Sequence, residues 1–210
     1  MKIEIWSDVV CPFCYIGKRH LEQALAQLPE LDVEITWKSF ELDPHASSNS
    51  EVDIYDMLAK KYGQDREWAK KINANMIQMA ERAGLEFNMD EVKPTNSFDA
   101  HRLLHLAKKH EKQEELEEIF FSAYFSEGRH LGQKKELQEL GEKAGLDSGE
   151  ILDVLESDQY KDAVNHDVVQ AQNLGVQGVP FFYINQKYGL SGAQPVDTFV
   201  KALGEINEKG

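Results

Sequence analysis

The sequence predicts an α/β fold in which a small mixed sheet flanked by helices is interrupted by an all-helical insertion. Three observations lead to this prediction. A strand–helix–strand pattern fills the first 40 residues, the middle of the chain has helical periodicity, and two short strands and a helix follow Gly175. We therefore expect one split α/β domain, with its N-terminal part over residues 1–45, the insertion over 46–165 and its C-terminal part over 166–210.

The N-terminal part contains two segments in which apolar and polar residues alternate, Lys2–Trp6 and Val33–Phe40. Such alternation with β-branched residues is typical of strands. Between them, apolar residues recur at helical spacing over residues 12–28, and Pro29 ends the predicted helix. The first segments therefore predict a β–α–β unit.

The middle of the chain, from Val52 to Leu174, shows no convincing strand. Apolar residues recur there at intervals of three and four positions, which indicates amphipathic helices with charged outer faces. The segments with this pattern are 100–107, 116–123, 137–144, 151–155 and 164–171.

The C-terminal part returns to strands. The apolar and aromatic segment Val179–Ile184 reads as a buried strand, residues 185–187 as a turn, and Tyr188–Ser191 as a short partner strand. Pro195 then precedes a final helix with apolar residues at helical spacing. These elements complete a small sheet with the N-terminal strands.

The charge balance argues against two classes of partner. The 210 residues include 23 Lys and Arg against 37 Asp and Glu, a net charge of −14. Nucleic acids and anionic membranes attract clustered positive charge, so we expect neither as a partner. The N-terminus lacks the pattern of a signal peptide, and no apolar run reaches the length of a membrane helix. We expect a cytoplasmic protein that is a monomer or a homodimer.

The chain contains only two cysteines, Cys11 and Cys14, in one C-x-x-C motif. A disulfide scaffold needs more cysteines, and a structural zinc site usually needs a second pair of ligands nearby. His101 and His105 are four residues apart on a predicted helix, but no H-E-x-x-H pattern accompanies them. We therefore expect redox chemistry at the cysteines and no metal site.

Position along the predicted helix assigns different roles to the two thiols. Cys11 falls at the N-cap and Pro12 at the first helical position, where its missing N–H costs nothing. The partial positive charge of a helix N-terminus favours a thiolate, so we expect Cys11 to have a lowered pKa and to be the nucleophile. Cys14 lies one turn further along the helix and is expected to be the resolving thiol.

Four segments of the sequence resemble the DsbA-like thioredoxin-fold proteins. They are SDVVCPFCYIGK, GVPFF near residue 180, LSGAQP, and NSFDAHRL at 96–103. The similarity is greatest to the cytoplasmic branch that includes FrnE and the 2-hydroxychromene-2-carboxylate isomerases, with kappa-class glutathione transferases nearby. It covers essentially the whole chain and implies a thioredoxin-like fold with an active site at the cysteines.

The resemblance also implies which residues meet the substrate. Val179–Pro180 would be a cis peptide bond that lies against the cysteines and leaves the Val179 backbone free to pair with an extended substrate. Pro12 and Phe13, between the cysteines, are expected to contact the substrate. Asn96 and His101 belong to the segment that resembles the family's insertion helix. We therefore expect both residues to line the substrate groove.

The presence of both Cys11 and Cys14 favours dithiol–disulfide exchange over the activities of the related isomerases and transferases. The isomerase and kappa-transferase branches carry Ser at the position that matches Cys11, which favours dithiol–disulfide exchange here. We expect a thiol–disulfide oxidoreductase that acts on thiols and disulfides of proteins or small molecules. It would have no tightly bound cofactor, with glutathione or another low-molecular-weight thiol as redox partner. The alternatives are a glutathione-dependent isomerase or transferase, and a non-enzymatic peptide-binding redox sensor or chaperone.

Two further interpretations stay open from the sequence. Asp8 either accepts a proton near Cys14 or simply occupies the loop. Four methionines of the insertion either belong to an ordinary core or line an adaptable groove, and they are Met57, Met76, Met79 and Met89.

Overall fold

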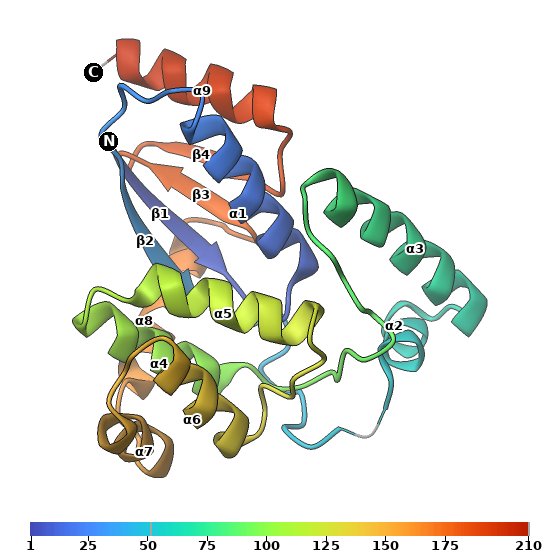
Figure 1. The fold of residues 1–210 in the computed structure, drawn as a ribbon. Coiled ribbons are helices and arrows are strands. Elements are labelled where there is room, and N and C mark those ends of the chain that lie inside the picture. The colour runs from blue at the N-terminus through green and yellow to red at the C-terminus, as the bar shows by residue number, and fades with distance from the viewer. Residues whose placement is uncertain (51, 210) are drawn as a thin grey trace.

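A computed structural model describes residues 1–50 and 52–209 and confirms an α/β fold with a four-stranded mixed sheet. Helices cover both faces of the sheet (Figure 1). The elements in chain order are β1 (Lys2–Ser7), α1 (Pro12–Leu25), β2 (Glu34–Ser39), α2 (Ile54–Tyr62), α3 (Arg66–Arg82), α4 (Phe98–Lys109), α5 (Gln113–Phe125), α6 (Lys134–Lys143), α7 (Ser148–Glu156), α8 (Lys161–Asn173), β3 (Phe181–Ile184), β4 (Tyr188–Ser191) and α9 (Val196–Glu208).

The sheet has the order β2-β1-β3-β4. β1 pairs in parallel with β2 because the helix α1 connects them, and it pairs antiparallel with β3. β3 and β4 form an antiparallel hairpin whose turn residues Asn185 and Gln186 have positive φ angles. Such angles suit a tight hairpin turn. β1 therefore lies in the middle of the sheet and ends at the loop that carries Cys11.

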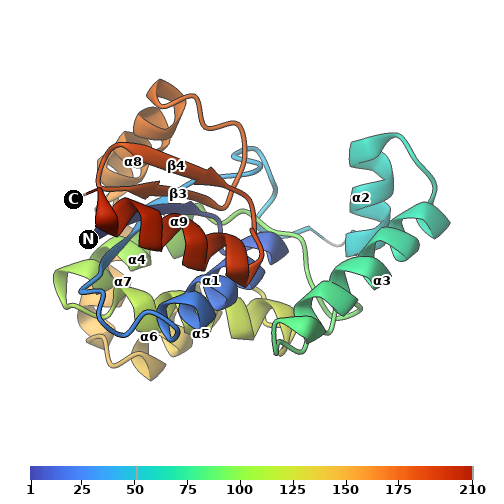
Figure 2. The ribbon, with the colours of Figure 1, turned by 90° about the horizontal axis from the view of Figure 1, so that it is seen from above.

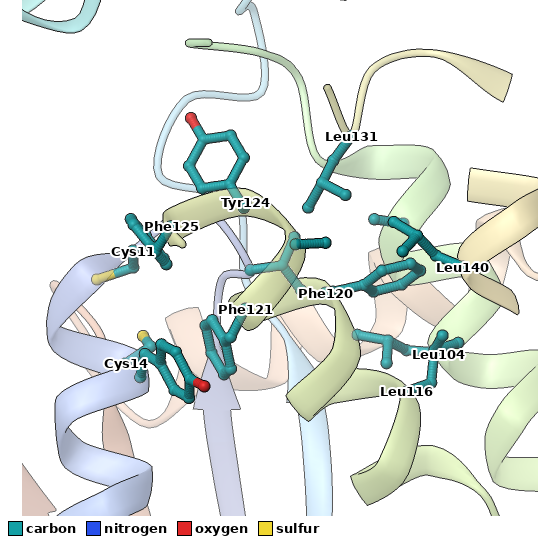
Figure 3. Packing of buried hydrophobic residues seen from close by; sticks show 14 of the residues in the cluster. Cys11, Cys14, Leu104, Leu116, Phe120, Phe121, Tyr124, Phe125, Leu131 and Leu140 are labelled. Atoms are coloured by element: carbon teal, nitrogen blue, oxygen red, sulfur yellow. The ribbon is translucent and has the colours of Figure 1, made fainter. Parts of the chain in front are cut away.

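Two hydrophobic cores divide the molecule. The first lies between one face of the sheet and the helices α1 and α9, and includes Ile5, Phe182 and Phe199. The second is built largely by the insertion around Phe120 and Phe121 of α5. Cys11 and Cys14 belong to the second core, beside Phe121 and Phe125 (Figure 3). The two cysteines are thus packed by the insertion rather than by the core between the sheet, α1 and α9.

The helices α2 and α3 form a hairpin that projects from the rest of the molecule (Figure 2). The sequence patterns named above did not identify either helix. α2 begins at the N-cap Asp53, whose side chain accepts a hydrogen bond from the Asp56 N–H, and α3 begins in the same way at Asp65. Few large apolar side chains are buried in either helix, which explains why periodicity alone did not mark them: the buried residues are Ile54 and Ala59 in α2, and Ala69, Asn73, Met76 and Ala80 in α3.

The two N-terminal strands differ from their predicted ends by one residue, and three other boundaries differ for identifiable reasons. α1 ends at Leu25, three residues early, because the residues before Pro29 form tight turns instead of continuing the helix. β3 begins at Phe181 rather than Val179, since Pro180 has no N–H for the sheet. The boundary predicted between residues 165 and 166 falls inside α8, which is continuous and packs on β2.

Candidate active site

The two cysteines lie at the N-terminal end of α1. Cys11 is the N-cap with an extended backbone, and Pro12 occupies the first turn, as the sequence predicts. The Cys14 N–H donates to the Cys11 carbonyl at 3.0 Å. Both thiols are free, with exposed fractions of 3% for Cys11 and 0% for Cys14.

The Cys11 sulfur faces the segment before β3. Its thiol donates to the Val179 carbonyl, with 3.7 Å between sulfur and oxygen, and the Val179–Pro180 peptide bond is cis. Gly17 lets α1 approach this segment, because a Cβ at Gly17 would lie 2.9 Å from Pro180 Cγ. The close packing of α1 therefore fixes Cys11 beside the Val179 backbone.

A cavity of about 320 Å³ opens beside Cys11. Pro12 and Val179 line it, and Phe13 lies at its edge with an exposed fraction of 42%. Asp8, Asp43 and Lys61 supply the charged side chains of its lining, and the rest of its wall is mostly apolar. The apolar residues come largely from α2, α3 and the segment between α3 and α4, and include Ile54, Met57, Leu58, Met76, Met89 and Val92.

Three of the four methionines of the insertion contribute to that wall. Met57, Met76 and Met89 line the cavity, whereas Met79 is exposed. Met76 and Met89 are also buried members of the insertion core. Met76 and Met89 therefore belong to the hydrophobic core and also line the groove, so both interpretations of these methionines apply.

The Cys14 thiol faces the interior instead. Burial raises its pKa well above the usual range, and the neighbouring Cys11 side chain adds to the rise. Hydrogen bonding with the Asp8 backbone and the Ser7 side chain counteracts part of it. Cys14 is therefore sealed from solvent but touches polar groups at the end of β1.

Those polar groups continue into a buried carboxylate. The Ser7 hydroxyl donates to Glu117 Oε1 at 2.9 Å, and Glu117, on α5, has an exposed fraction of 1%. Burial raises the pKa of Glu117 to about 7. Its Oε2 atom has no hydrogen-bond partner in the part of the chain that the structure describes.

His101 joins the same cluster. Its Nε2 lies 3.5 Å from Asp8 Oδ1. Burial alone would lower the pKa of His101, but the carboxylates of Asp8, Glu117 and Glu41 outweigh it and raise that pKa. The Asp8 carboxylate also accepts the Leu42 N–H at 2.8 Å, so it fastens the loop after β2 to the active site.

The structure corrects the expectation that Asn96 and His101 line the substrate groove. His101 is only 1% exposed, because α4 turns its ring inward toward Asp8. The Asn96 side chain accepts the Phe98 N–H and donates to the Pro44 carbonyl. Both side chains are thus used in internal contacts, and of this segment it is Ser97 that borders the cavity.

The two histidines of α4 bind different carboxylates. His105 Nε2 lies 3.2 Å from Asp167 Oδ2, away from the Asp8 contact of His101. Within residues 1–50 and 52–209, no group of three or more His, Cys, Asp or Glu side chains is arranged to hold a metal ion.

The sequence analysis did not identify Ser7, Gly17 or Glu117. One signal could have found Glu117: it precedes Phe121 by four positions and Tyr124 by seven, so it shares a buried helix face with them. A carboxylate on an apolar face is unusual unless it has a partner or a function. Ser7 and Gly17 carry no comparable local signal.

Comparison with known proteins agrees with this geometry. The family model described as a DSBA-like thioredoxin domain matches residues 2–204. The chain belongs to the DsbA-like thioredoxin family. It is 32% identical to the uncharacterized protein YwbO of Bacillus subtilis, over 99% of this chain and 98% of that protein.

Solved structures of DsbA-like proteins share the fold. A probable DsbA oxidoreductase from Streptomyces coelicolor superposes with a TM-score of 0.92 at 40% identity, over 98% of this chain and 89% of that one. The cytosolic disulfide reductase DsbM from Pseudomonas aeruginosa superposes with a TM-score of 0.70 at 14% identity, over the full length of both chains. DsbM has also been solved with GSH. Among the described residues, no helix is long and apolar enough to cross a membrane.

Proposed function

We propose that this DsbA-like protein catalyses thiol–disulfide exchange with Cys11 as the nucleophile and Cys14 as the resolving thiol. The observation that carries the proposal is the unequal placement of the two thiols. Cys11 borders an open cavity beside the Val179 backbone, whereas Cys14 is fully buried one turn along α1. A substrate can therefore reach Cys11 first, and Cys14 can act only from within.

The reaction proceeds in two balanced steps. In the reducing direction, the Cys11 thiolate attacks one sulfur of a substrate disulfide, forms a mixed disulfide and releases the first substrate thiolate. Cys14 then attacks the Cys11 sulfur, forms the Cys11–Cys14 disulfide and releases the second thiolate. The oxidising direction reverses both steps.

The cavity supports substrates with apolar groups next to the reacting sulfur. Its wall is mostly apolar, and Lys61 is the only cation among its lining residues in the described chain. Burial of apolar substrate surface contributes roughly 25 cal/mol per Å². The exposed Phe13 ring and the Val179 backbone would contact the substrate near the sulfur, with strand-like pairing to an extended peptide. A small thiol such as glutathione would recycle the cysteines.

A thiol titration tests the proposal. The protein is equilibrated across a series of reduced-to-oxidised thiol buffers and then alkylated, and the free thiols are counted by mass. We expect both thiols to disappear together in one two-electron transition that is absent in Cys11→Ser, and the midpoint gives the favoured direction. If Cys11 only acquires one buffer thiol, the glutathione-dependent isomerase or transferase alternative replaces the proposal.

Cys14→Ser separates the alternatives further. Exchange requires Cys14, so this variant should accumulate the mixed disulfide on Cys11 and turn over no further. An isomerase or transferase would keep its activity in Cys14→Ser. A peptide-binding chaperone would keep its binding in the variant that lacks both cysteines.

A further inference from the structure

Two buried polar side chains interrupt the apolar wall of the cavity beside Cys11, and the exchange reaction, as written above, uses neither. Tyr124 of α5 and Asn73 of α3 line this cavity, and each residue has an exposed fraction of 2%. Polar groups are costly to bury unless they form hydrogen bonds. Their presence in a mostly apolar wall therefore indicates that a hydrogen-bonding group enters the cavity.

The Tyr124 hydroxyl is a donor that faces the cavity. Figure 3 shows its oxygen turned away from Phe121 and Cys14. It forms no hydrogen bond within the described part of the chain, and it is not one of the fully enclosed polar atoms, so it reaches the cavity space. Burial and the Asp8 carboxylate raise the pKa of Tyr124 above its usual range, so the hydroxyl keeps its proton at neutral pH. Buried tyrosine hydroxyls usually have a partner.

The side-chain amide of Asn73 is held in one orientation. Its Nδ2 donates to the Ala69 carbonyl, one turn earlier in α3, at 3.0 Å. Because a carbonyl only accepts, the atom bonded to it must be the nitrogen, and Oδ1 faces the other way. Oδ1 has no hydrogen-bond partner among residues 1–50 and 52–209 and is not enclosed. Asn73 therefore presents an acceptor to the cavity.

The donor and the acceptor come from separate parts of the wall. Tyr124 lies at the end of α5 beside the cysteines, whereas Asn73 belongs to the projecting α2–α3 hairpin (Figures 2 and 3). A peptide group has one acceptor and one donor, its C=O and its N–H, and in the trans form these point in opposite directions. An extended peptide in the cavity can therefore satisfy both side chains.

We propose that Tyr124 and Asn73 select substrates by their peptide backbone, with Tyr124 donating to a substrate C=O and Asn73 accepting a substrate N–H. This inference rests on the proposed exchange function and makes the substrate a disulfide of a polypeptide. A purely apolar group in the cavity would shield both side chains from water and leave them unpaired, which is costly. The cavity thus accepts apolar side chains together with the amides that connect them.

Charged groups match this wall less well than a neutral amide does. A carboxylate has no hydrogen to donate to Asn73 Oδ1, and it would share the cavity with the carboxylates of Asp8 and Asp43. Within the described chain, Lys61 is the only cation of the lining. An amide pairs with both Tyr124 and Asn73 and brings no charge into the apolar wall.

The shape of the surface favours a polypeptide over a small peptide thiol. A second hollow of about 500 Å³ adjoins the cavity, and the two share the lining residues Leu42, Met57 and Pro94. The groove therefore continues beyond the space beside Cys11. Several successive residues of an extended chain can occupy it, whereas a small thiol would fill only the part next to the sulfur.

An ester scan tests which amides are recognised. A peptide disulfide with apolar neighbours is prepared in versions in which each amide near the cysteine is replaced in turn by an ester, which removes the N–H and keeps a carbonyl. In the wild-type protein, we expect one replacement to lower kcat/KM about fivefold, or about 1 kcal/mol for a neutral hydrogen bond. Asn73→Leu should lower kcat/KM for the all-amide peptide about as much and should no longer distinguish that ester.

Tyr124→Phe removes the hydroxyl and keeps the ring. It should lower kcat/KM for the all-amide peptide about fivefold, and it should still distinguish the ester because Asn73 is intact. Tyr183→Phe is the matched control. It removes an exposed hydroxyl of β3 that donates to the Gln186 carbonyl, and it should leave kcat/KM unchanged.

Two small disulfides complete the test. Hydroxyethyl disulfide has no amide, so Tyr124→Phe and Asn73→Leu should react with it as fast as wild type, and oxidised glutathione should be less affected than the peptide. Unchanged kcat/KM for the peptide in both variants, an equal loss with hydroxyethyl disulfide, or a larger loss with oxidised glutathione would overturn the proposal. A wild-type protein that exchanges with none of these disulfides would instead reject the exchange function itself.

Discussion

The surroundings of Cys11 and Cys14 differ sharply although only one helical turn separates the two cysteines. On the Cys11 side, an apolar cavity lies between α1 and the α2–α3 hairpin, and exposed Phe13 stands at its edge. On the Cys14 side, the space is closed and filled by Ser7, Glu117 and their charged neighbours. The difference shows that the insertion gives one cysteine an accessible, apolar surrounding and the other a closed surrounding that includes polar groups.

The physical cause is the direction of side chains at the start of a helix. Cys11, as the N-cap, stands outside the helical turns and points toward Val179, whereas Cys14 lies within the first turn and points toward the end of β1. α5 then covers Cys14 with aromatic rings, including Phe121 (Figure 3). Four predictions test this division, beginning with the largest expected effect.

The first prediction concerns access to the two thiols. In Cys14→Ser, the remaining Cys11 should react with iodoacetamide at pH 7 on the order of a thousandfold faster than Cys14 does in Cys11→Ser. The reason is the complete burial and raised pKa of Cys14. Mass spectrometry of timed samples measures both rates. In denaturant the rates should converge, and similar rates in the folded proteins would contradict the division.

The second prediction concerns the stability cost of Glu117. Its pKa is raised from 4.5 to about 7 on folding, so the folded state binds more protons between these values, and the free energy of unfolding must fall as the pH rises through this range. Glu117→Gln removes that cost. At 1.36 kcal/mol per pKa unit, it should be more stable than wild type by up to about 3 kcal/mol at pH 8, and the gain should vanish near pH 4.

Urea unfolding at several pH values measures this difference. Glu118→Gln is the matched control with the opposite sign. Hydrogen bonds and ion pairing with Lys18 outweigh burial and lower the pKa of Glu118, so its carboxylate stabilises the fold above pH 4.5, and this contribution is lost as the pH falls through its folded pKa. Stability profiles of the same shape in both variants would contradict the assignment of Glu117 as the costly group.

The third prediction concerns the contact that keeps Cys11 beside Val179. Gly17→Ala places a Cβ 2.9 Å from Pro180 Cγ and 3.3 Å from Phe182 Cζ, which should lower the free energy of unfolding by about 1–3 kcal/mol. Gly204→Ala in α9 is the control. A Cβ there meets no atom within 4 Å, so its better helix propensity should raise stability by about 0.5–1 kcal/mol. Thermal unfolding of both variants reports the two signs.

The fourth and smallest effect concerns the cavity. Met57→Lys places a charge on its apolar wall and should raise the KM for a peptide disulfide with apolar neighbours about tenfold, by the loss of roughly 1.4 kcal/mol of apolar contact. The kcat should change little. Met79→Lys, on the exposed surface of α3, should leave both constants unchanged. Equal behaviour of the two variants would show that substrates do not enter the cavity.

Much of the fold could be predicted from local signals. The β–α–β start, the N-cap position of Cys11, the β3–β4 hairpin and the last helix all follow from periodicity and from Pro positions within a few residues. The helices α2 and α3 were not identified because most of their buried positions carry small or polar residues, such as Ala59, Ala69 and Asn73, instead of large apolar ones. His101 was misplaced because its position on α4 did not reveal which way the ring faces.

The sequence by itself determined the chemistry available to this DsbA-like protein: two thiols at a helix N-terminus, with a Val–Pro segment elsewhere in the chain. The tertiary structure alone decided that Cys11 faces a cavity and that Ser7 and Glu117, 110 positions apart, form a hydrogen bond behind Cys14. The physical reason is the distance along the chain over which each kind of interaction acts. Periodicity and capping act between neighbours in the chain, whereas burial, the raised pKa of Glu117 and the cavity wall arise only where distant segments pack together.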